Sequence, residues 1–214
     1  MNREPIEAVI FDCDGTLVDS ESLSISVLVD FVSELGLQLD FHESLQQFSG
    51  NDLSFVLGHI ERQLGRDLPP SFMGQFRRRQ MRILRQQVRA VDGAEDLLAS
   101  MNLPFCIASN APPQKIEVCL KTAGLDHFFR AGFIQSAYDI GVWKPAPDLF
   151  LKSAQLLRAP PERCAVVEDS IYGIDAGVSA GMQVYALDPH GRFSSDSRIT
   201  TVPSLFHLKP LLLQ

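Results

Sequence analysis

The chain has 214 residues, of which 45% are hydrophobic and 21% charged, and this composition is typical of a globular protein. Its 19 basic and 26 acidic residues give a net charge of −7, which argues against nucleic acid as a partner. No run of about 18 apolar residues occurs, and the N-terminal residues lack the apolar core of a signal peptide, so we expect no membrane partner and a cytoplasmic location.

The first predicted element is a strand over residues 6–11. The apolar run that ends at Phe11 shows no polar alternation, which indicates a strand buried on both faces. Asp12 and Asp14 follow it at a turn, where open α/β sheets bind ligands, and residues two apart on an extended segment point the same way. Two close carboxylates require a divalent metal or one protonated acid, although an ordinary polar turn with a helix cap is the alternative.

Residues 20–88 have helical periodicity and contain no strand-like run. The apolar spacing and the stop signals predict four helices, at about 20–35, 41–48, 52–64 and 70–88. A block of roughly 70 residues can hold a small core of its own. We therefore expect an all-helical insertion at 19–88, and a second domain made of residues 1–18 and 89–214.

From Val91 onward, short apolar strands alternate with helices. The strands are predicted at 105–108, 131–134, 164–167, 183–186 and 200–202. The helices are predicted at 92–98, 112–123, 145–157, 171–180 and 205–212. Strands that alternate with helices of about ten residues are typical of a parallel sheet with right-handed crossovers. The sequence thus predicts an α/β fold with a Rossmann-like parallel sheet core and an inserted all-helical cap.

Polar residues stand where successive strands end, and one lysine precedes a helix: Asp12 and Asp14, Ser109 and Asn110, Glu168 and Asp169, and Lys144. Because parallel strands place their C-terminal ends at one edge, we expect these side chains to converge. Carboxylates without histidine suit Mg²⁺, whose shell is commonly completed by phosphate oxygens. Lysine, serine and turn amides could hold the other phosphate oxygens, as in phosphoryl transfer. Each residue alone could be a helix cap or a solvated charge, so the prediction depends on their joint occurrence.

Four motifs occur in a fixed order: FDCDGTLVDS at 11–20, SN at 109–110, WKP at 143–145 and VVEDS at 166–170. Their order and spacing over nearly the whole chain resemble the haloacid dehalogenase (HAD) superfamily, which also carries a helical cap after the first motif. The sequence is most similar to the β-phosphoglucomutase-like group, and several stretches resemble its bacterial 6-phosphogluconate phosphatase-like branch. This resemblance implies a Rossmann-like core and phosphoryl-transfer chemistry.

The resemblance also implies catalytic roles. Asp12 would be the nucleophile that takes the phosphoryl group as an aspartyl-phosphate. Asp14 would be the general acid that protonates the leaving alcohol and then the base that activates water. Ser109 would bind a phosphoryl oxygen with Asn110 beside it, and Lys144 would neutralise charge on the nucleophile and the phosphate.

The implied metal is Mg²⁺, held by the Asp12 side chain, the Asp14 backbone carbonyl and Asp169, with Glu168 assisting directly or through water. The helical cap would close over the site and contact the leaving group. Its substrate loop is expected at 48–52, where Asn and Asp stand in place of the Lys or Arg that relatives often carry. We interpret the arginine-rich stretch 77–85 as a solvated face, with contact to an anionic substrate as the alternative.

The alternatives within the family differ at single positions. Asp14 argues against a haloacid dehalogenase, and the absence of lysine from 19–90 argues against a phosphonatase. Ser24 stands where a phosphomutase carries a cap histidine, which favours hydrolysis. A non-catalytic binding module would lack a motif residue, and none is missing.

We therefore expect a monomeric, Mg²⁺-dependent phosphoric monoester hydrolase that acts on a small-molecule phosphate ester. A sugar phosphate or a sugar-acid phosphate is the expected substrate. A phosphomutase and a non-catalytic module remain as alternatives.

Overall fold

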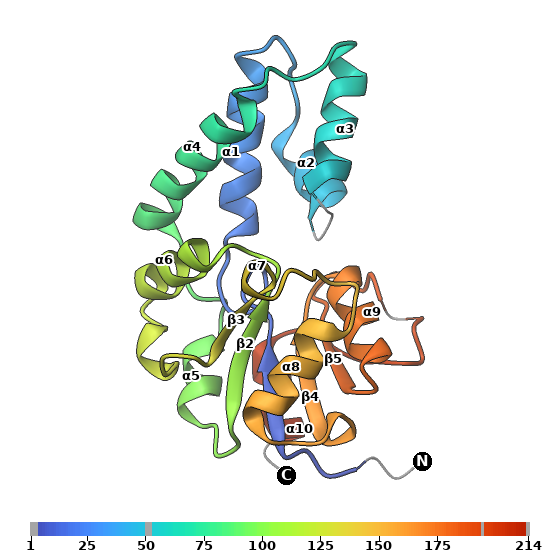
Figure 1. Cartoon of the computed structure of the whole chain (residues 1–214). Coiled ribbons are helices and arrows are strands. Elements are labelled where there is room, and N and C mark those ends of the chain that lie inside the picture. Colours follow the sequence, from blue (N-terminus) through green and yellow to red (C-terminus); the bar gives the residue numbers. More distant parts are fainter. Residues whose placement is uncertain (1–3, 50–52, 194, 213–214) are drawn as a thin grey trace.

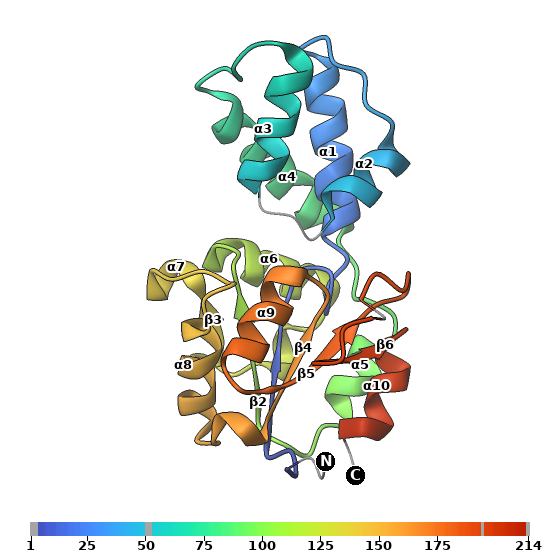
Figure 2. The ribbon, with the colours of Figure 1, turned by 90° about the vertical axis from the view of Figure 1, so that its right-hand side faces the viewer.

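The computed structural model describes residues 4–49, 53–193 and 195–212, and it has two layers along its long axis. A helical layer made of α1 to α4 lies above a parallel sheet that is flanked by helices (Figures 1 and 2). Within the described residues, no helix is long and apolar enough to cross a membrane. The predicted α/β fold class is confirmed.

The sheet has six parallel strands in the order β3-β2-β1-β4-β5-β6. Their bounds are β1 Ala8–Phe11, β2 Phe105–Ser109, β3 Ile134–Ser136, β4 Cys164–Glu168, β5 Gln183–Leu187 and β6 Thr200–Val202. The first strand occupies an inner position, with Ile10 paired to Cys106 on one side and to Val166 on the other. Because every strand runs the same way, the C-terminal ends of β1, β2 and β4 meet at one edge, directly below the helical layer.

Both faces of β1 are buried, as its unbroken apolar run predicts. Val9 and Phe11 belong to the core under α5 (Ala94–Ala99), α6 (Pro113–Ala123) and α10 (Leu205–Leu212). Ala8 and Ile10 belong to the core under α8 (Asp148–Leu157) and α9 (Ile171–Ser179). The alternation of side chains along one strand therefore joins the two halves of the core, and it holds the end of β1 in a fixed place.

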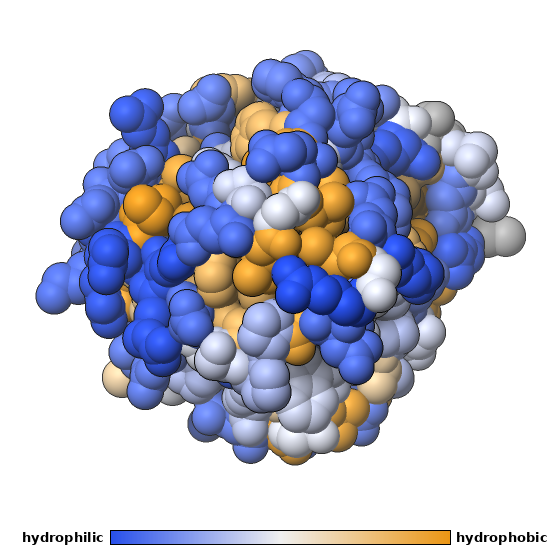
Figure 3. Space-filling model, turned by 90° about the horizontal axis from the view of Figure 1, so that it is seen from above, coloured by the Kyte–Doolittle hydropathy of each residue, from blue (hydrophilic) through white to orange (hydrophobic). Residues whose placement is uncertain are grey.

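The helical layer has a hydrophobic core of its own. The layer consists of α1 Glu21–Ser33, α2 Phe41–Phe48, α3 Leu53–Leu64 and α4 Phe72–Gln87, and side chains from all four helices form this core. Phe31 stacks on Phe72 with ring centroids 4.6 Å apart, and Ile60 is fully buried between the helices. Seen from above, hydrophilic residues form most of the periphery of this layer, and hydrophobic residues gather nearer its centre (Figure 3). We call these four helices the cap.

The chain passes between the sheet and the cap twice, and the two passages run side by side. Val18 forms an antiparallel bridge with Ala90, and the Asp19 amide donates to the Arg89 carbonyl at 2.9 Å. The predicted domain boundaries fall near these passages. The division of the chain into two domains at these points stays a prediction.

One strand and one helix begin three residues later than predicted, and the short helix α7 (Ala137–Ile140) and the 3-10 helices Asp126–Phe128 and Pro161–Arg163 were not predicted. The third strand is Ile134–Ser136 and not 131–134, because Gly132 forms a turn with a φ of +88° before it. Helix α8 begins at Asp148 and not at Pro145. The reason is that a proline disfavours helical backbone at the residue before it, and Pro147 has this effect on Ala146. Helix α7 follows directly after β3.

Substitution of Ile60 by alanine tests how much packing in the cap core contributes to the stability of the protein. We expect Ile60→Ala to lower the free energy of unfolding by about 2–5 kcal/mol, because it leaves a cavity among rigid helices. Urea unfolding measures the change. Ile171→Ala is the matched control: its side chain is 41% exposed, so its cost is expected to stay within about 0.5 kcal/mol. Equal costs for the two variants would contradict the packing described.

Candidate active site

All seven predicted site residues line one cavity of about 940 Å³ between the sheet edge and the cap. Asp12 follows β1, Ser109 ends β2 and Glu168 ends β4, so three neighbouring strands deliver them to the same place. Lys144 arrives on the loop between α7 and α8. The expected convergence of these side chains is therefore observed, and the buried parallel strands are its cause.

A buried lysine joins two of the carboxylates. The Lys144 ammonium lies 2.5 Å from Asp12 Oδ1 and 2.6 Å from Glu168 Oε1. Burial alone would lower the pKa of Lys144, but the Asp12 and Glu168 charges outweigh burial and raise the pKa. The lysine therefore stays charged, and its position is set by two strands at once.

Asn110 holds the backbone of Lys144. Its side-chain carbonyl accepts from the Lys144 amide at 2.9 Å, and its side-chain NH₂ donates to the Lys144 carbonyl at 3.2 Å. The side-chain amide predicted to lie beside the phosphate is thus engaged by the protein itself. Ser109 is buried at the end of β2, and its hydroxyl accepts from the Ala111 amide at 3.1 Å.

Asp14 has a cationic partner that the sequence analysis missed. The Lys115 ammonium lies 2.8 Å from Asp14 Oδ1, and the Ser20 hydroxyl donates to the same oxygen. Burial acts to raise the pKa of Asp14, but Lys115 and the hydrogen bonds outweigh it and lower the pKa. Lys115 lies in the first turn of α6, where the helix dipole disfavours a cation. A lysine at this unfavourable position in a predicted helix is the sequence feature that indicates a nearby carboxylate partner.

Asp169 packs closely against the turn that follows Asp14. Thr16 donates its hydroxyl to Asp169 Oδ1 at 2.8 Å. Gly15 has a φ of +81°, and a Cβ at this position would lie 2.2 Å from Asp169 Oδ2. The turn therefore needs glycine both for its backbone conformation and for the space that the carboxylate occupies.

Glu168 anchors the loop between β4 and α9. Its Oε2 accepts from the Asp169 amide at 3.0 Å and from the amide and hydroxyl of Ser170, each at 2.9 Å. Its Oε1 accepts from Lys144. Both oxygens of Glu168 are thus committed to the protein.

The sequence matches a known protein family over most of its length. Residues 6–181 match the family described as haloacid dehalogenase-like hydrolase. The chain belongs to this family. It is 34% identical to an Escherichia coli 6-phosphogluconate phosphatase over 96% of this chain and 94% of that protein. It is 32% identical to a probable pseudouridine-5′-phosphatase of Drosophila melanogaster over 94% of this chain and 90% of the relative.

A solved structure of a conserved haloacid dehalogenase-like protein of unknown function from Agrobacterium tumefaciens is also similar. It shares 29% identity, covers 97% of both chains and superposes with a TM-score of 0.84. The predicted family and the predicted class of enzyme, a phosphoric monoester hydrolase, are confirmed by these comparisons.

The charges at the sheet edge of this HAD hydrolase do not balance. Asp12, Asp14, Glu168 and Asp169 are carboxylates, and among the residues that the structure describes, Lys144 and Lys115 are the cations that form ion pairs with them. Burial raises the pKa of Asp12 to about 8 and that of Asp169 well above its usual range. Four carboxylates beside two ammonium groups leave an excess of negative charge, which fits a divalent cation with a preference for oxygen.

The described residues contain no group of three His, Cys, Asp or Glu side chains arranged for a metal. The predicted set needs only two carboxylates, Asp12 and Asp169, together with the Asp14 backbone carbonyl. It fits the residues present. Glu168 Oε1 accepts from Lys144, and its Oε2 accepts from the Asp169 and Ser170 amides; its predicted assistance to the metal, directly or through water, stays a prediction.

The cap contributes Ser24 to the cavity at the position where a phosphomutase would carry histidine. Its hydroxyl donates to the Ser20 carbonyl at 2.6 Å and accepts from the Gln80 amide at 2.8 Å. Of the expected substrate loop, Phe48 lines the cavity. Ser49 follows as the C-cap residue of α2, and positions 50–52 of the predicted loop lie outside the described residues.

Gly173 lies against the Glu168 carboxylate, so a substitution at this position tests the anchoring role of Glu168. A Cβ there would lie 1.8 Å from Glu168 Oε1, so we expect Gly173→Ala to displace the carboxylate and to weaken its contact with Lys144. The expected result is a fall in kcat of at least about tenfold and a stability loss of about 1–3 kcal/mol. Turnover of p-nitrophenyl phosphate and urea unfolding measure the two effects.

The matched control is Gly58→Ala in the cap. A Cβ at Gly58 meets only Arg62 Nη1, at 3.7 Å, and alanine is favoured over glycine inside a helix. Wild-type turnover in Gly173→Ala would contradict the anchoring role of Glu168.

Proposed function

We propose that this protein is a Mg²⁺-dependent phosphatase of sugar phosphates or sugar-acid phosphates that works through an aspartyl-phosphate on Asp12. The observation that carries the proposal is the buried ammonium of Lys144 between Asp12 and Glu168. A fixed positive charge beside a carboxylate at a sheet edge suits the transfer of a phosphoryl group. The similarity to a 6-phosphogluconate phosphatase supports the substrate class.

In the first step, an Asp12 carboxylate oxygen forms a bond to phosphorus while the bond from phosphorus to the leaving oxygen breaks. Asp14 gives a proton to that oxygen, and the alcohol departs. Lys144 and the Ser109 hydroxyl hold the phosphoryl oxygens. Asn110 contributes by fixing the Lys144 backbone.

In the second step, Asp14 removes a proton from water, and the water oxygen attacks phosphorus. The bond between phosphorus and Asp12 breaks, and inorganic phosphate and free Asp12 result. Lys115 favours the ionised base form of Asp14. A bound phosphate dianion opposes that effect and favours the acid form needed for the first step.

The metal would be held by Asp12, Asp169 and the Asp14 carbonyl, and when bound it supplies positive charge to the phosphoryl oxygens. Thr16 and Gly15 keep Asp169 in position. We further propose that residues 19–88 form a separate cap domain and that the enzyme is a cytoplasmic monomer. The serine at position 24 supports hydrolysis over a mutase reaction.

Loss of the nucleophile tests the covalent mechanism. We expect Asp12→Asn to lower kcat by more than about a thousandfold, because an amide cannot accept the phosphoryl group. Phosphate release is the measurement, and thermal unfolding reports the fold. Asp30→Asn, an exposed substitution in α1, is the matched control and should retain full turnover. Substantial turnover by Asp12→Asn would rule the mechanism out.

Removal of the metal tests the divalent site. We expect an excess of chelator to abolish phosphate release and excess Mg²⁺ to restore it. We also expect Mg²⁺ to raise the unfolding temperature of the wild type, since a cation that binds only the native state stabilises it. Asp169→Asn should lose most of this thermal shift. Unchanged rates in chelator, or an equal thermal shift in the variant, would contradict the assignment.

A further inference from the structure

One arginine of the cap faces the cavity without a carboxylate partner. Arg77 on α4 lines the cavity, and its guanidinium donates to the Tyr138 hydroxyl at 3.4 Å. Within the described part of the chain, Arg77 forms no ion pair. The other cations that line the cavity, Lys115 and Lys144, are each paired with carboxylates. Among the described residues that line the cavity, Arg77 is therefore the cation that is available to a ligand.

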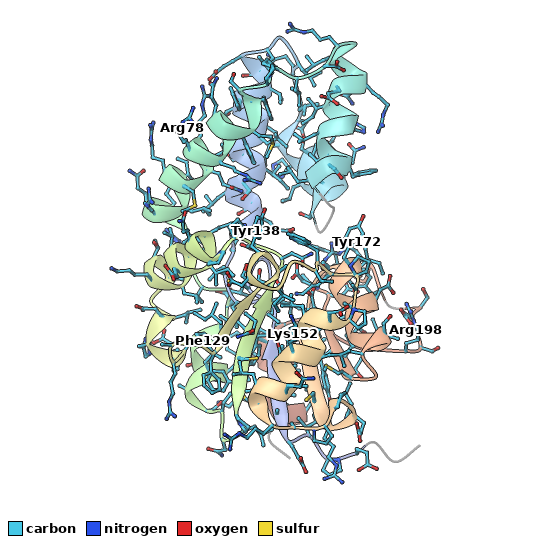
Figure 4. All side chains as sticks on the ribbon, viewed as in Figure 1. Arg78, Phe129, Tyr138, Lys152, Tyr172 and Arg198 are labelled. Carbon is cyan, nitrogen blue, oxygen red and sulfur yellow. The ribbon has the colours of Figure 1, made fainter. Side chains whose placement is uncertain are left out.

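The neighbouring arginines have different surroundings. Arg79 pairs with Glu34 at 2.5 Å and lies over the Phe31 ring, 4.1 Å from its centroid. Arg78 extends from the outer side of α4 (Figure 4), and it does not line the cavity. The interpretation of this stretch as a solvated face thus suits Arg78, whereas the position of Arg77 on the cavity lining is compatible with the alternative, a contact to an anionic substrate.

Aromatic side chains surround the same part of the cavity. Phe55, Tyr138 and Trp143 line it and are 46%, 45% and 44% exposed, which is high for aromatic residues. Tyr138 and Trp143 meet edge to face at 5.5 Å, and Figure 4 shows Tyr138 and Tyr172 at the gap between cap and sheet. Exposed aromatic rings in a concave site indicate a ligand surface, and their faces suit the C–H groups of a carbon chain.

We propose that Arg77 binds a carboxylate at the far end of the leaving group, so that the preferred esters are sugar-acid phosphates. This inference rests on the phosphatase function proposed above. The planar guanidinium offers paired N–H donors that match a carboxylate. A second phosphate would bring about two negative charges, and the described cavity residues offer no further unpaired cation to balance them. Tyr138 is a positioning residue that orients the guanidinium from the core side.

The experiment uses the full chain with Mg²⁺ and two esters that differ in one group. In 6-phosphogluconate the terminal carbon is a carboxylate, and in glucitol 6-phosphate it is an alcohol. We expect the wild type to prefer the acid, and Arg77→Met to lower the ratio of the two kcat/KM values by roughly ten- to a hundredfold, mainly through KM for the acid. Arg77→Lys should keep part of the preference, and the matched control Arg78→Met should keep all of it.

The outcomes separate the two proposals. An active wild type whose preference for the acid is absent, or survives in Arg77→Met, overturns the role of Arg77 alone. A stronger preference for fructose 1,6-bisphosphate that disappears in Arg77→Met overturns the carboxylate and assigns a phosphate instead. A wild type that releases no phosphate from these esters or from p-nitrophenyl phosphate overturns the phosphatase function itself.

Discussion

The burial of like charges at one edge of the sheet is the constraint on which the rest of the site depends. Four carboxylates gather there because parallel strands end together, and burial of carboxylates away from water is unfavourable unless cations compensate it. Lys144 and Lys115 offset part of this cost from two different elements. The remaining negative charge would favour a divalent cation, and the cation together with the lysines would favour a phosphate ester.

Glycine stands at the positions where the backbone lies closest to these carboxylates. Gly15 and Gly173 are positions at which a single methyl group would collide with Asp169 or Glu168. The Asn110 side chain hydrogen-bonds to the Lys144 backbone, and Glu168 accepts hydrogen bonds from the loop that carries Asp169. Several polar side chains at this edge therefore hold other residues in position, and a smaller number remain that could contact the substrate.

This division explains what the sequence could and could not predict. The buried strands have unbroken apolar runs, so β1, β2 and β4 were predicted closely, and with them the meeting of the residues that follow. The strand Ile134–Ser136 has polar side chains and gives no such signal. Partners across the fold, such as Lys115 for Asp14 or Asn110 for Lys144, depend on how α6 and the loop at 144 dock. Spacing along the chain does not carry that information.

The part of the fold that is proposed to recognise the leaving group has a hydrophobic core of its own. This part, the cap, meets the sheet through two adjacent passages, so its cavity-facing residues can change without disturbing the strand ends. Relatives at 34% and 32% identity carry names with different substrates, a sugar-acid phosphate and a nucleotide. A core that performs the chemistry, combined with a cap whose cavity-facing side chains can be exchanged, would account for such different substrates. In this chain, Arg77 and the aromatic rings are the residues where that difference would be expressed.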